Sequence, residues 1–235
     1  MKAVILSGGL GTRLKPFTEI IPKPLLPIGE KSVLEIQIER LKKSGFSEIF
    51  FATNYKSDYI ENFFGDGSRY GVKIKYSKET KPLGTAGPIT LLRNEFTEPI
   101  LVMNGDILTL LDFEKFYNFA VENDALLTIA IKKEITPFAF GNIFFEGDIV
   151  TGIQEKPNIE MYILAGIYVM KPEILNYIPE ETYYGMDSLI LNLLKNGIKI
   201  KKYDIHEYWL DIGRLSDYEQ AQDFYNKHLE DLNNK

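Results

Sequence analysis

The stretch KAVILSGGLGTRL, residues 2–14, decides the fold that we expect for this chain. Residues 2–6 predict a short buried strand, and the three glycines among residues 7–11 predict a loop directly after it. Such a loop lets backbone amides turn towards a ligand, most often phosphate. It is not a dinucleotide-binding fingerprint, because Leu14 stands where that pattern needs a glycine, and no Gly-Lys-Ser/Thr follows as in a Walker loop. The glycines alone also fit a simple tight turn.

The sequence beyond this loop alternates short apolar runs with segments of helical period as far as residue 131. Ser32 and Glu35 predict a capping box at the start of the first long helix, and Gly45 predicts its end. Strands that alternate with helices are typical of an α/β sheet. The predicted strands are 2–6, 49–53, 72–76, 99–103 and 125–131, and the predicted helices are 32–44, 57–64, 85–94 and 113–122.

After about Pro137 the pattern becomes mixed and partly antiparallel. Two runs separated by Glu146-Gly147-Asp148 predict a hairpin. The segments expected here are strands 140–145, 149–155, 163–170 and 198–203 and helices 188–194 and 215–232. No linker separates the two parts, so we expect a single domain, residues 1–235, with subregions 1–137 and 138–235. The stretch 177–184 is expected to be a surface loop.

Composition limits the chemistry that is available. The 235 residues are 45% hydrophobic and 26% charged with a net charge of −6, which is typical of a soluble globular protein and gives no chain-wide footprint for nucleic acid. There is no Cys, and His206 and His228 are the only histidines, which excludes disulfides, thiolate nucleophiles and multi-histidine metal sites. No apolar run approaches a membrane span or a signal peptide, so we expect a cytoplasmic protein with neither membrane nor nucleic acid as partner.

Two cations follow the glycine loop. Arg13 ends the loop, and Lys23 stands between Pro22 and Pro24, which restrict the backbone around it. An Arg that makes forked contacts and a Lys that acts as a point charge together suit a triphosphate. Taken singly, each also fits a solvated surface charge.

Two carboxylates are candidates for binding a metal ion. Asp106 follows the apolar strand 99–103, and ligands of α/β sheets gather at the carboxyl ends of strands. Asp211 follows Trp209. Mg²⁺ prefers carboxylate oxygens and keeps several waters, so one or two Asp suffice. The alternatives are a hairpin turn at Asn104-Gly105 for Asp106 and a helix cap for Asp211.

The residues from Gly8 to Pro24 closely resemble the signature of the sugar-1-phosphate nucleotidyltransferases. Further segments resemble other elements of that family, in the family's order and over nearly the full chain. They are Pro82–Gly87 (base binding), Asn104–Asp106 (metal), Glu155–Pro157 (sugar phosphate) and Trp209–Gly213 (metal). The short layout is similar to that of guanylyltransferases for mannose or heptose 1-phosphate.

The resemblance implies a Rossmann-like mixed, mostly parallel sheet flanked by helices, without a C-terminal β-helix. Residues 1–137 would bind the nucleotide and residues 138–235 the sugar phosphate.

The implied reaction is Mg²⁺-dependent: a nucleoside triphosphate and a sugar 1-phosphate give an NDP-sugar and pyrophosphate. Arg13, Lys23 and Asp106 are the implied catalytic residues. The implied nucleotide-binding residues are Leu6, Gly8, Gly9, Gly11, Thr12, Arg13, Lys23, Pro82, Leu83, Gly84 and Thr85, with Leu83 packing on the base; Asp106 and Asp211 would bind Mg²⁺.

The implied sugar-phosphate residues are Asn104, Gly141, Glu155, Lys156 and Gly166. Without the resemblance, Glu155 and Lys156 fit a charged loop, Gly141 fits a bulge and Thr85 fits a helix cap. Leu164 departs from the family, which often has Asn there to hold the sugar, so that role is not carried over.

The resemblance leaves the substrates open. It favours GTP with a mannose- or heptose-type 1-phosphate, while thymidylyl, uridylyl or cytidylyl transfer to glucose 1-phosphate, another sugar 1-phosphate or phosphocholine remains an alternative. A glycosyltransferase is a disfavoured alternative. The metal site of such enzymes usually shows the pattern Asp-x-Asp, whereas Ile107-Leu108 follows Asp106 here. A non-catalytic binder of NDP-sugars is a further alternative, although this chain keeps the charged residues that such proteins tend to lose. A homodimer is compatible with the sequence.

Overall fold

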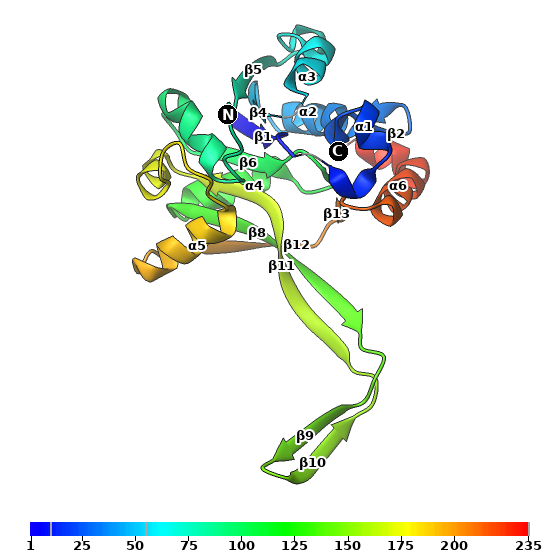
Figure 1. Cartoon of the computed structure of the whole chain (residues 1–235). Helices are drawn as coiled ribbons and strands as arrows, with labels where there is room; N and C mark the ends of the chain where they lie inside the picture. The colour runs from blue at the N-terminus through cyan, green and yellow to red at the C-terminus, as the bar shows by residue number, and fades with distance from the viewer. Residues whose placement is uncertain (10, 55, 235) are drawn as a thin grey trace.

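The computed structural model of the protein describes residues 1–9, 11–54 and 56–234, so Leu10 of the glycine loop lies outside the described residues. A seven-stranded sheet forms the centre, in the order β12-β8-β11-β6-β1-β4-β5 (Figure 1). β11 alone runs antiparallel to its neighbours in this sheet. The predicted mixed, mostly parallel sheet is therefore confirmed. Its strands are β1 (Lys2–Leu6), β4 (Glu48–Thr53), β5 (Lys73–Lys78), β6 (Ile100–Asn104), β8 (Leu127–Pro137), β11 (Asn158–Met170) and β12 (Lys201–Ile205).

Helices cover both faces of this sheet. α2 (Val33–Lys43), α3 (Ser57–Phe64) and α4 (Phe113–Glu122) pack on the face that carries Ala3 and Ile5 of β1. The opposite face, with Val4, is covered by η4 (Gly87–Glu95), η5 (Pro172–Tyr177) and α5 (Met186–Lys195). Alternate residues of β1 thus enter two different cores, as expected for a central strand buried on both faces.

A smaller core joins the C-terminal helix to the N-terminal loops. Tyr225 of α6 (Leu215–Asn234) packs there with Leu14 and Ile28. The short elements nearby are η1 (Thr12–Leu14), α1 (Phe17–Ile20), η2 (Lys23–Leu25), β2 (Pro27–Ile28), β3 (Lys31–Ser32), β7 (Ile107–Thr109) and β13 (Trp209–Asp211); η3 (Ser68–Tyr70) lies between α3 and β5. Among the described residues, no helix is long and apolar enough to cross a membrane.

The predicted capping box of α2 is present. The Ser32 hydroxyl accepts a hydrogen bond from the Glu35 amide at 3.2 Å, and the Glu35 carboxylate accepts one from the Ser32 amide at 2.8 Å. Gly45, with φ of 82°, follows the end of the helix in the left-handed region. Helix α2 packs in the same core as β1 and β6, so this capping helps to fix the layer that covers one face of the sheet.

The segment predicted as a helix over 85–94 differs from the expectation. It begins at Gly87 and is a 3₁₀ helix. Thr85 does not cap it, because the Thr85 hydroxyl accepts a hydrogen bond at 2.8 Å from the amide of Met186, the first residue of α5. This contact ties two helices together at the edge of the sheet.

Residues 132–163 form a projecting segment, which we call the arm (Figure 1). β8 and β11 pair continuously from Ile131 with Leu164 out to Pro137 with Asn158, well past the predicted strand ends. The predicted hairpin is confirmed as β9 (Asn142–Glu146) and β10 (Ile149–Gln154), at the far end of the arm. The arm leaves the carboxyl edge of the parallel strands.

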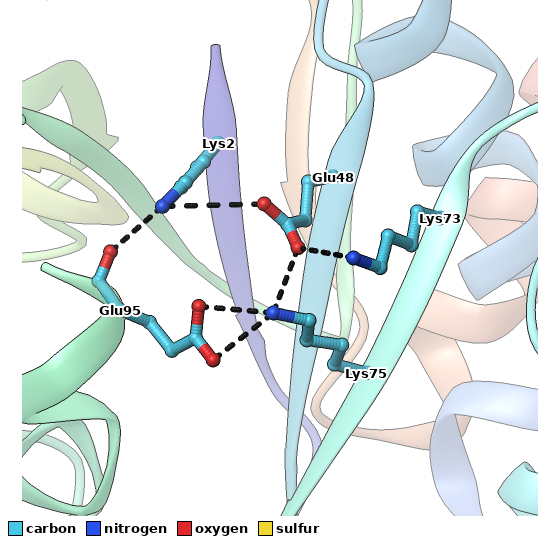
Figure 2. Close-up of polar contacts among 5 residues, drawn as sticks. All are labelled: Lys2, Glu48, Lys73, Lys75 and Glu95. Atoms are coloured by element: carbon cyan, nitrogen blue, oxygen red, sulfur yellow. Dashed lines mark hydrogen bonds and ion pairs between the residues drawn. The ribbon is translucent and has the colours of Figure 1, made fainter.

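A cluster of charges lies at the opposite, amino edge of the sheet (Figure 2). The Glu48 carboxylate lies 2.9 Å from the ammonium of Lys75 and 3.4 Å from that of Lys73, and Lys75 also pairs with Glu95 at 2.9 Å. Burial raises the pKa of Glu48, but the contacts with Lys75 and Lys73 outweigh it and leave the pKa below its usual value of 4.5.

We expect Glu48→Gln to lower the free energy of unfolding by about 1 kcal/mol at pH 7, the upper range for partly exposed ion pairs. A lowered folded-state pKa means that this stabilisation is present above pH 4.5 and is lost as the pH falls through the pKa of Glu48 in the folded protein. Urea unfolding at pH 7 and pH 3 measures the difference, with exposed Glu122→Gln as control. If Glu48→Gln lowered the free energy of unfolding equally at both pH values, the stabilising role of the ionised Glu48 carboxylate would be contradicted.

Candidate active site

A pocket of about 450 Å³ opens at the carboxyl ends of β1, β4 and β6. This is the edge at which α/β sheets bind ligands. It brings together nine of the residues singled out from the sequence: Leu6, Gly8, Gly9, Lys23, Pro82, Gly84, Thr85, Asn104 and Asp106. The pocket is also lined by residues that were not singled out, among them Asn54, Glu79 and Tyr183.

At Gly8 and Gly11 the glycine loop makes close contacts that leave little room for a side chain. A Cβ on Gly8 would lie 2.8 Å from the Glu79 carboxylate. Gly11 has φ of 61°, and a Cβ there would lie 2.9 Å from the Thr18 methyl group. The Thr18 hydroxyl donates a hydrogen bond to the Gly11 carbonyl at 2.8 Å, so α1 holds the end of the loop. Gly8 and Gly9 line the pocket, so the backbone of the loop faces the space in which a phosphate would bind.

Thr12 and Arg13 lie in η1, just outside the residues that line the pocket. A Cβ on Gly213 would lie 3.7 Å from a guanidinium nitrogen of Arg13. The Arg13 charge also acts to lower the pKa of Asp211. Arg13 therefore lies beside the second predicted metal ligand, at the rim of the pocket.

Lys23 and Asp106 form an ion pair on the floor of the pocket. The Lys23 side chain is only 11% exposed, and its ammonium pairs with Oδ2 of Asp106. Oδ1 of Asp106 is buried and has no hydrogen-bond partner among the described residues. Because a buried carboxylate oxygen without a partner is costly, Oδ1 is available to a cation.

Asp211 lies next to Asp106 through strand pairing. β13 pairs with β7 so that Asp211 is opposite Ile107, and the Ile212 amide donates to the Asp106 carbonyl at 3.0 Å. Burial and the Asp106 charge raise the pKa of Asp211. Asp211 does not cap the following helix, because Asp217 accepts the amides of Gly213 and Arg214 instead.

These two carboxylates fit a magnesium ion. Asp211 ends β13, and Asp106 lies in the turn just before β7, the strand that pairs with β13. Asp106 has a buried oxygen that is unpartnered among the described residues, and the Asp106 charge together with burial disfavours the ionised form of Asp211. Mg²⁺ commonly takes one or two protein carboxylates and completes its coordination with water and phosphate oxygens.

The segment 83–87 is fixed by Tyr184. The Tyr184 amide donates to the Leu83 carbonyl at 2.9 Å, and the Ala86 amide donates to the Tyr184 carbonyl at 2.9 Å. Gly84 has φ of 83°, and a Cβ there would lie 2.6 Å from the Tyr184 carbonyl oxygen. The Leu83 side chain is buried in the protein and does not line the pocket, contrary to the expectation that it packs on a base. Residues 178–184 form a largely exposed loop, as expected, but Tyr183 of this loop lines the pocket, which the sequence did not indicate.

Glu79 is a pocket residue that the sequence reasoning missed. Its Oε2 accepts a hydrogen bond from the Leu83 amide at 2.8 Å. Burial raises the pKa of Glu79, opposed by the hydrogen bonds from Leu83 and Asn54. A signal existed, since Glu79 directly follows β5 and Asn54 directly follows β4, at the carboxyl ends of parallel strands. No comparable signal pointed to Tyr183.

The predicted sugar-phosphate residues fall into two separate groups. Asn104 ends β6, and Gly166, with φ of 68°, lies against it: a Cβ on Gly166 would be 2.6 Å from the Asn104 amide nitrogen. Gly141, Glu155 and Lys156 lie on the arm, where a Cβ on Gly141 would be 3.1 Å from the Glu155 carboxylate. These three are exposed and are not among the residues that line the pocket of the same chain. Of the five predicted sugar-phosphate residues, Asn104 is the one that lines the pocket among the residues described.

Comparison with known proteins places these features in a family. A family model described as nucleotidyl transferase matches residues 2–228. The probable mannose-1-phosphate guanylyltransferase 1 of Oryza sativa subsp. japonica is 35% identical over 93% of this chain and 63% of its own length. A UTP–glucose-1-phosphate uridylyltransferase of Synechocystis sp. is 35% identical over 94% of this chain and 62% of its own length. The chain thus spans less than two thirds of these curated relatives.

Solved structures agree on the fold. HddC from Yersinia pseudotuberculosis is 30% identical, with a TM-score of 0.75 over 95% of this chain and 99% of that chain. A putative glucose-1-phosphate thymidylyltransferase from Bacillus anthracis has a TM-score of 0.79 at 24% identity, over 95% of this chain and 94% of that chain, which shows the fold alone. Because the family model matches residues 2–228, nearly the whole length of the chain, this chain belongs to the nucleotidyl transferase family.

Proposed function

We propose that this chain joins a nucleoside triphosphate to a sugar 1-phosphate, forming an NDP-sugar and pyrophosphate with the help of Mg²⁺. The observation that carries the proposal is the pocket at the carboxyl edge of the sheet, which the glycine loop and the Lys23–Asp106 pair line together, with Asp211 next to Asp106. The names of its relatives, a mannose-1-phosphate guanylyltransferase and a glucose-1-phosphate uridylyltransferase, support this reaction class.

In this reaction an oxygen of the sugar phosphate attacks the α-phosphorus of the nucleotide. The new P–O bond forms as the bond between the α-phosphorus and the bridging oxygen of the β-phosphate breaks, and pyrophosphate leaves with the electron pair. Such transfers depend on positioning and charge neutralisation, so no covalent enzyme intermediate is needed. Mg²⁺, held by Asp106 and Asp211, would neutralise charge on the phosphate oxygens.

The residues of the chain supply the rest of the stabilisation. The exposed amides of the glycine loop bind phosphate oxygens, and Lys23, released from Asp106, neutralises charge at the α-phosphate. Arg13, at the rim, binds the phosphates that depart. Lys156 holds the attacking phosphate, and Glu155 accepts hydrogen bonds from sugar hydroxyls.

Glu79 supports guanine as the base. A carboxylate offers only hydrogen-bond acceptors, and the pairing edge of guanine presents two adjacent donors, the ring N–H and the amino group. Uracil and thymine present one N–H between two carbonyl oxygens, and a carboxylate repels these two oxygens. Cytosine and adenine present one amino group beside an acceptor nitrogen. Glu79 lines the pocket beside Gly84, so GTP is the nucleotide we propose.

We expect Glu79→Gln to lower kcat/KM for GTP by about 100-fold, because the amide replaces one acceptor by a donor that faces a guanine donor. The same amide matches uracil and thymine, so activity with UTP and dTTP should rise relative to GTP. Pyrophosphate release with each triphosphate measures the change, with exposed Glu122→Gln as the matched control. An unchanged GTP preference in Glu79→Gln would contradict this role.

The proposed reaction is tested by pyrophosphate release with Mg²⁺ across four nucleoside triphosphates. Each is paired with mannose, heptose and glucose 1-phosphates and with phosphocholine, and EDTA is added to a parallel series. We expect turnover with GTP and a mannose- or heptose-type 1-phosphate that EDTA abolishes. A folded protein that binds an NDP-sugar tightly and turns over no pair would be a binding protein instead.

A further inference from the structure

The turn between β6 and β7 determines where the carboxylates of the site lie. Asn104 ends β6, Asp106 lines the pocket and Ile107 begins β7. Ile107 is also paired opposite Asp211, so the position of this turn bears on both proposed metal ligands. Connecting segments are generally more mobile than the strands they join, and a metal site needs its ligands held still.

Gln37 of α2 holds this turn from the helical layer beneath it. Its side-chain nitrogen Nε2 donates hydrogen bonds to the Asn104 carbonyl at 3.1 Å and to the Ile107 carbonyl at 2.8 Å. These two carbonyls stand on either side of Gly105 and Asp106. Because both are acceptors, the bridging group must supply N–H donors, and a primary amide has two. The Gln37 residue is only 3% exposed, so water does not compete for these bonds.

The middle of the turn is held by backbone contacts. The Gly105 amide donates to the Leu6 carbonyl at 2.9 Å, and the Asp106 carbonyl accepts from the Ile212 amide at 3.0 Å. A Cβ on Gly105 would lie 3.0 Å from the Leu6 carbonyl oxygen. Neighbouring strands thus hold residues 105 and 106, and one side chain, that of Gln37, holds the two ends of the turn.

Packing alone does not account for a glutamine at this position. Its neighbours on the buried face of α2, Leu34, Ile38 and Leu41, are apolar and fully buried. The Gln37 side-chain oxygen Oε1 is also buried and has no hydrogen-bond partner among the described residues. A buried acceptor without a partner costs stability, so α2 keeps the amide at this position despite that cost.

We propose that Gln37 is a positioning residue for the metal site. By bridging the carbonyls of Asn104 and Ile107 it sets the place of the Asp106 carboxylate and, through the pairing of β7 with β13, that of Asp211. Gln37 is not among the residues that line the pocket, so it acts through the turn and not on a substrate. The inference rests on the proposed function, which makes Asp106 and Asp211 metal ligands.

Binding of Mn²⁺ tests this role without any turnover. Mn²⁺ accepts the same oxygen ligands as Mg²⁺, and free Mn²⁺ is measured directly by electron paramagnetic resonance. Gln37→Met keeps the length of the side chain and removes both N–H groups, so we expect the Kd for Mn²⁺ to rise about 10-fold, as when a group that orients a metal ligand is lost. Gln37→Asn, one methylene shorter, withdraws the amide from the two carbonyls and should weaken binding to a similar extent.

Leu41→Ala is the matched control for stability. Leu41 is fully buried on the same helix, so this variant should lower Tm but keep the Mn²⁺ affinity of the wild type. Wild-type Mn²⁺ affinity in a folded Gln37→Met or Gln37→Asn protein would overturn the proposal. A loss of affinity that Leu41→Ala shares would also overturn it, since Gln37 would then act only through the stability of α2.

Pyrophosphate release separates this inference from the proposed function. In Gln37→Met the Mg²⁺ concentration that gives half the maximal rate should rise about 10-fold, while kcat at saturating Mg²⁺ stays within about threefold of wild type. Mn²⁺ binding that Asp106→Asn abolishes and Gln37→Met weakens, in a protein without turnover, would overturn the proposed function and keep the role of Gln37. Wild-type Mn²⁺ binding no tighter than that of Asp106→Asn would overturn both.

Discussion

Lys23→Met is expected to lower kcat for pyrophosphate release by about 1,000-fold, since a buried cation aimed at developing charge is worth several kcal/mol in a transition state. Lys23 is the one cation that lines the pocket among the residues described, and its side chain is 11% exposed. The two prolines beside it leave the backbone little freedom to bring another group into its place.

Lys15→Met is the matched control for this experiment. Lys15 follows the same loop, but its side chain is 58% exposed and pairs only at the surface with Glu19. We expect kcat of Lys15→Met to stay within about twofold of wild type, because an exposed ion pair contributes little energy. Steady-state pyrophosphate release with GTP measures both variants. A kcat of Lys23→Met within a few fold of wild type would mean that Lys23 acts only as the ion-pair partner of Asp106.

Asp106→Asn and Asp211→Asn are expected to lower kcat by a similar factor of about 1,000, because each removes a ligand for Mg²⁺. Their effects on the metal-free protein should have opposite signs. Asp106→Asn breaks the ion pair with Lys23 and should lower Tm. Asp211→Asn removes a carboxylate whose pKa is raised by burial and by Asp106, and should raise Tm at pH 7.

The sign for Asp211 follows from linkage. A folded-state pKa above the unfolded value of 3.8 means that the ionised group destabilises the fold, and that this cost disappears as the pH falls through the folded-state pKa. Thermal unfolding with and without Mg²⁺ measures both variants, with exposed Asp58→Asn as control. A wild-type increase in Tm on adding Mg²⁺ that persists in both variants would contradict the assignment of these ligands.

Much of the fold could be predicted because local rules and tertiary packing agree. Apolar runs and apolar periodicity predicted the strand before the glycine loop and the helices 57–64 and 113–122. Ser32 and Glu35 predicted the capping box of α2. The alternation of strands and helices predicted an α/β sheet, and the family resemblance implied that this sheet is mixed and mostly parallel.

The length of the arm could not be predicted, because Lys132, Lys133 and Glu134 show no alternation of apolar and polar residues. They extend β8 all the same, since a ladder exposed on both faces is held by backbone pairing and not by burial. Sequence order also cannot tell how far a hairpin extends, so it could not show that Lys156 lies outside its own pocket.

The site was predictable where a motif coincided with the end of a strand. Asp106 combined both signals, and strand pairing brings Asp211 beside it. Glu79 and Asn54 had only the strand-end position, and Tyr183 had neither, because it reaches the pocket through pairing of Tyr184 with the segment 83–87.

Isotope transfer shows whether the sugar phosphate attacks the α-phosphorus of GTP. Mannose 1-phosphate labelled with ¹⁸O at its three non-bridging phosphate oxygens is incubated with GTP, Mg²⁺ and the enzyme, and the products are weighed by mass spectrometry. Attack of the sugar phosphate on the α-phosphorus predicts GDP-mannose that keeps all the label and an equal amount of unlabelled pyrophosphate. GTP converted to GDP or GMP, with the labelled sugar phosphate returned unchanged, would contradict the account.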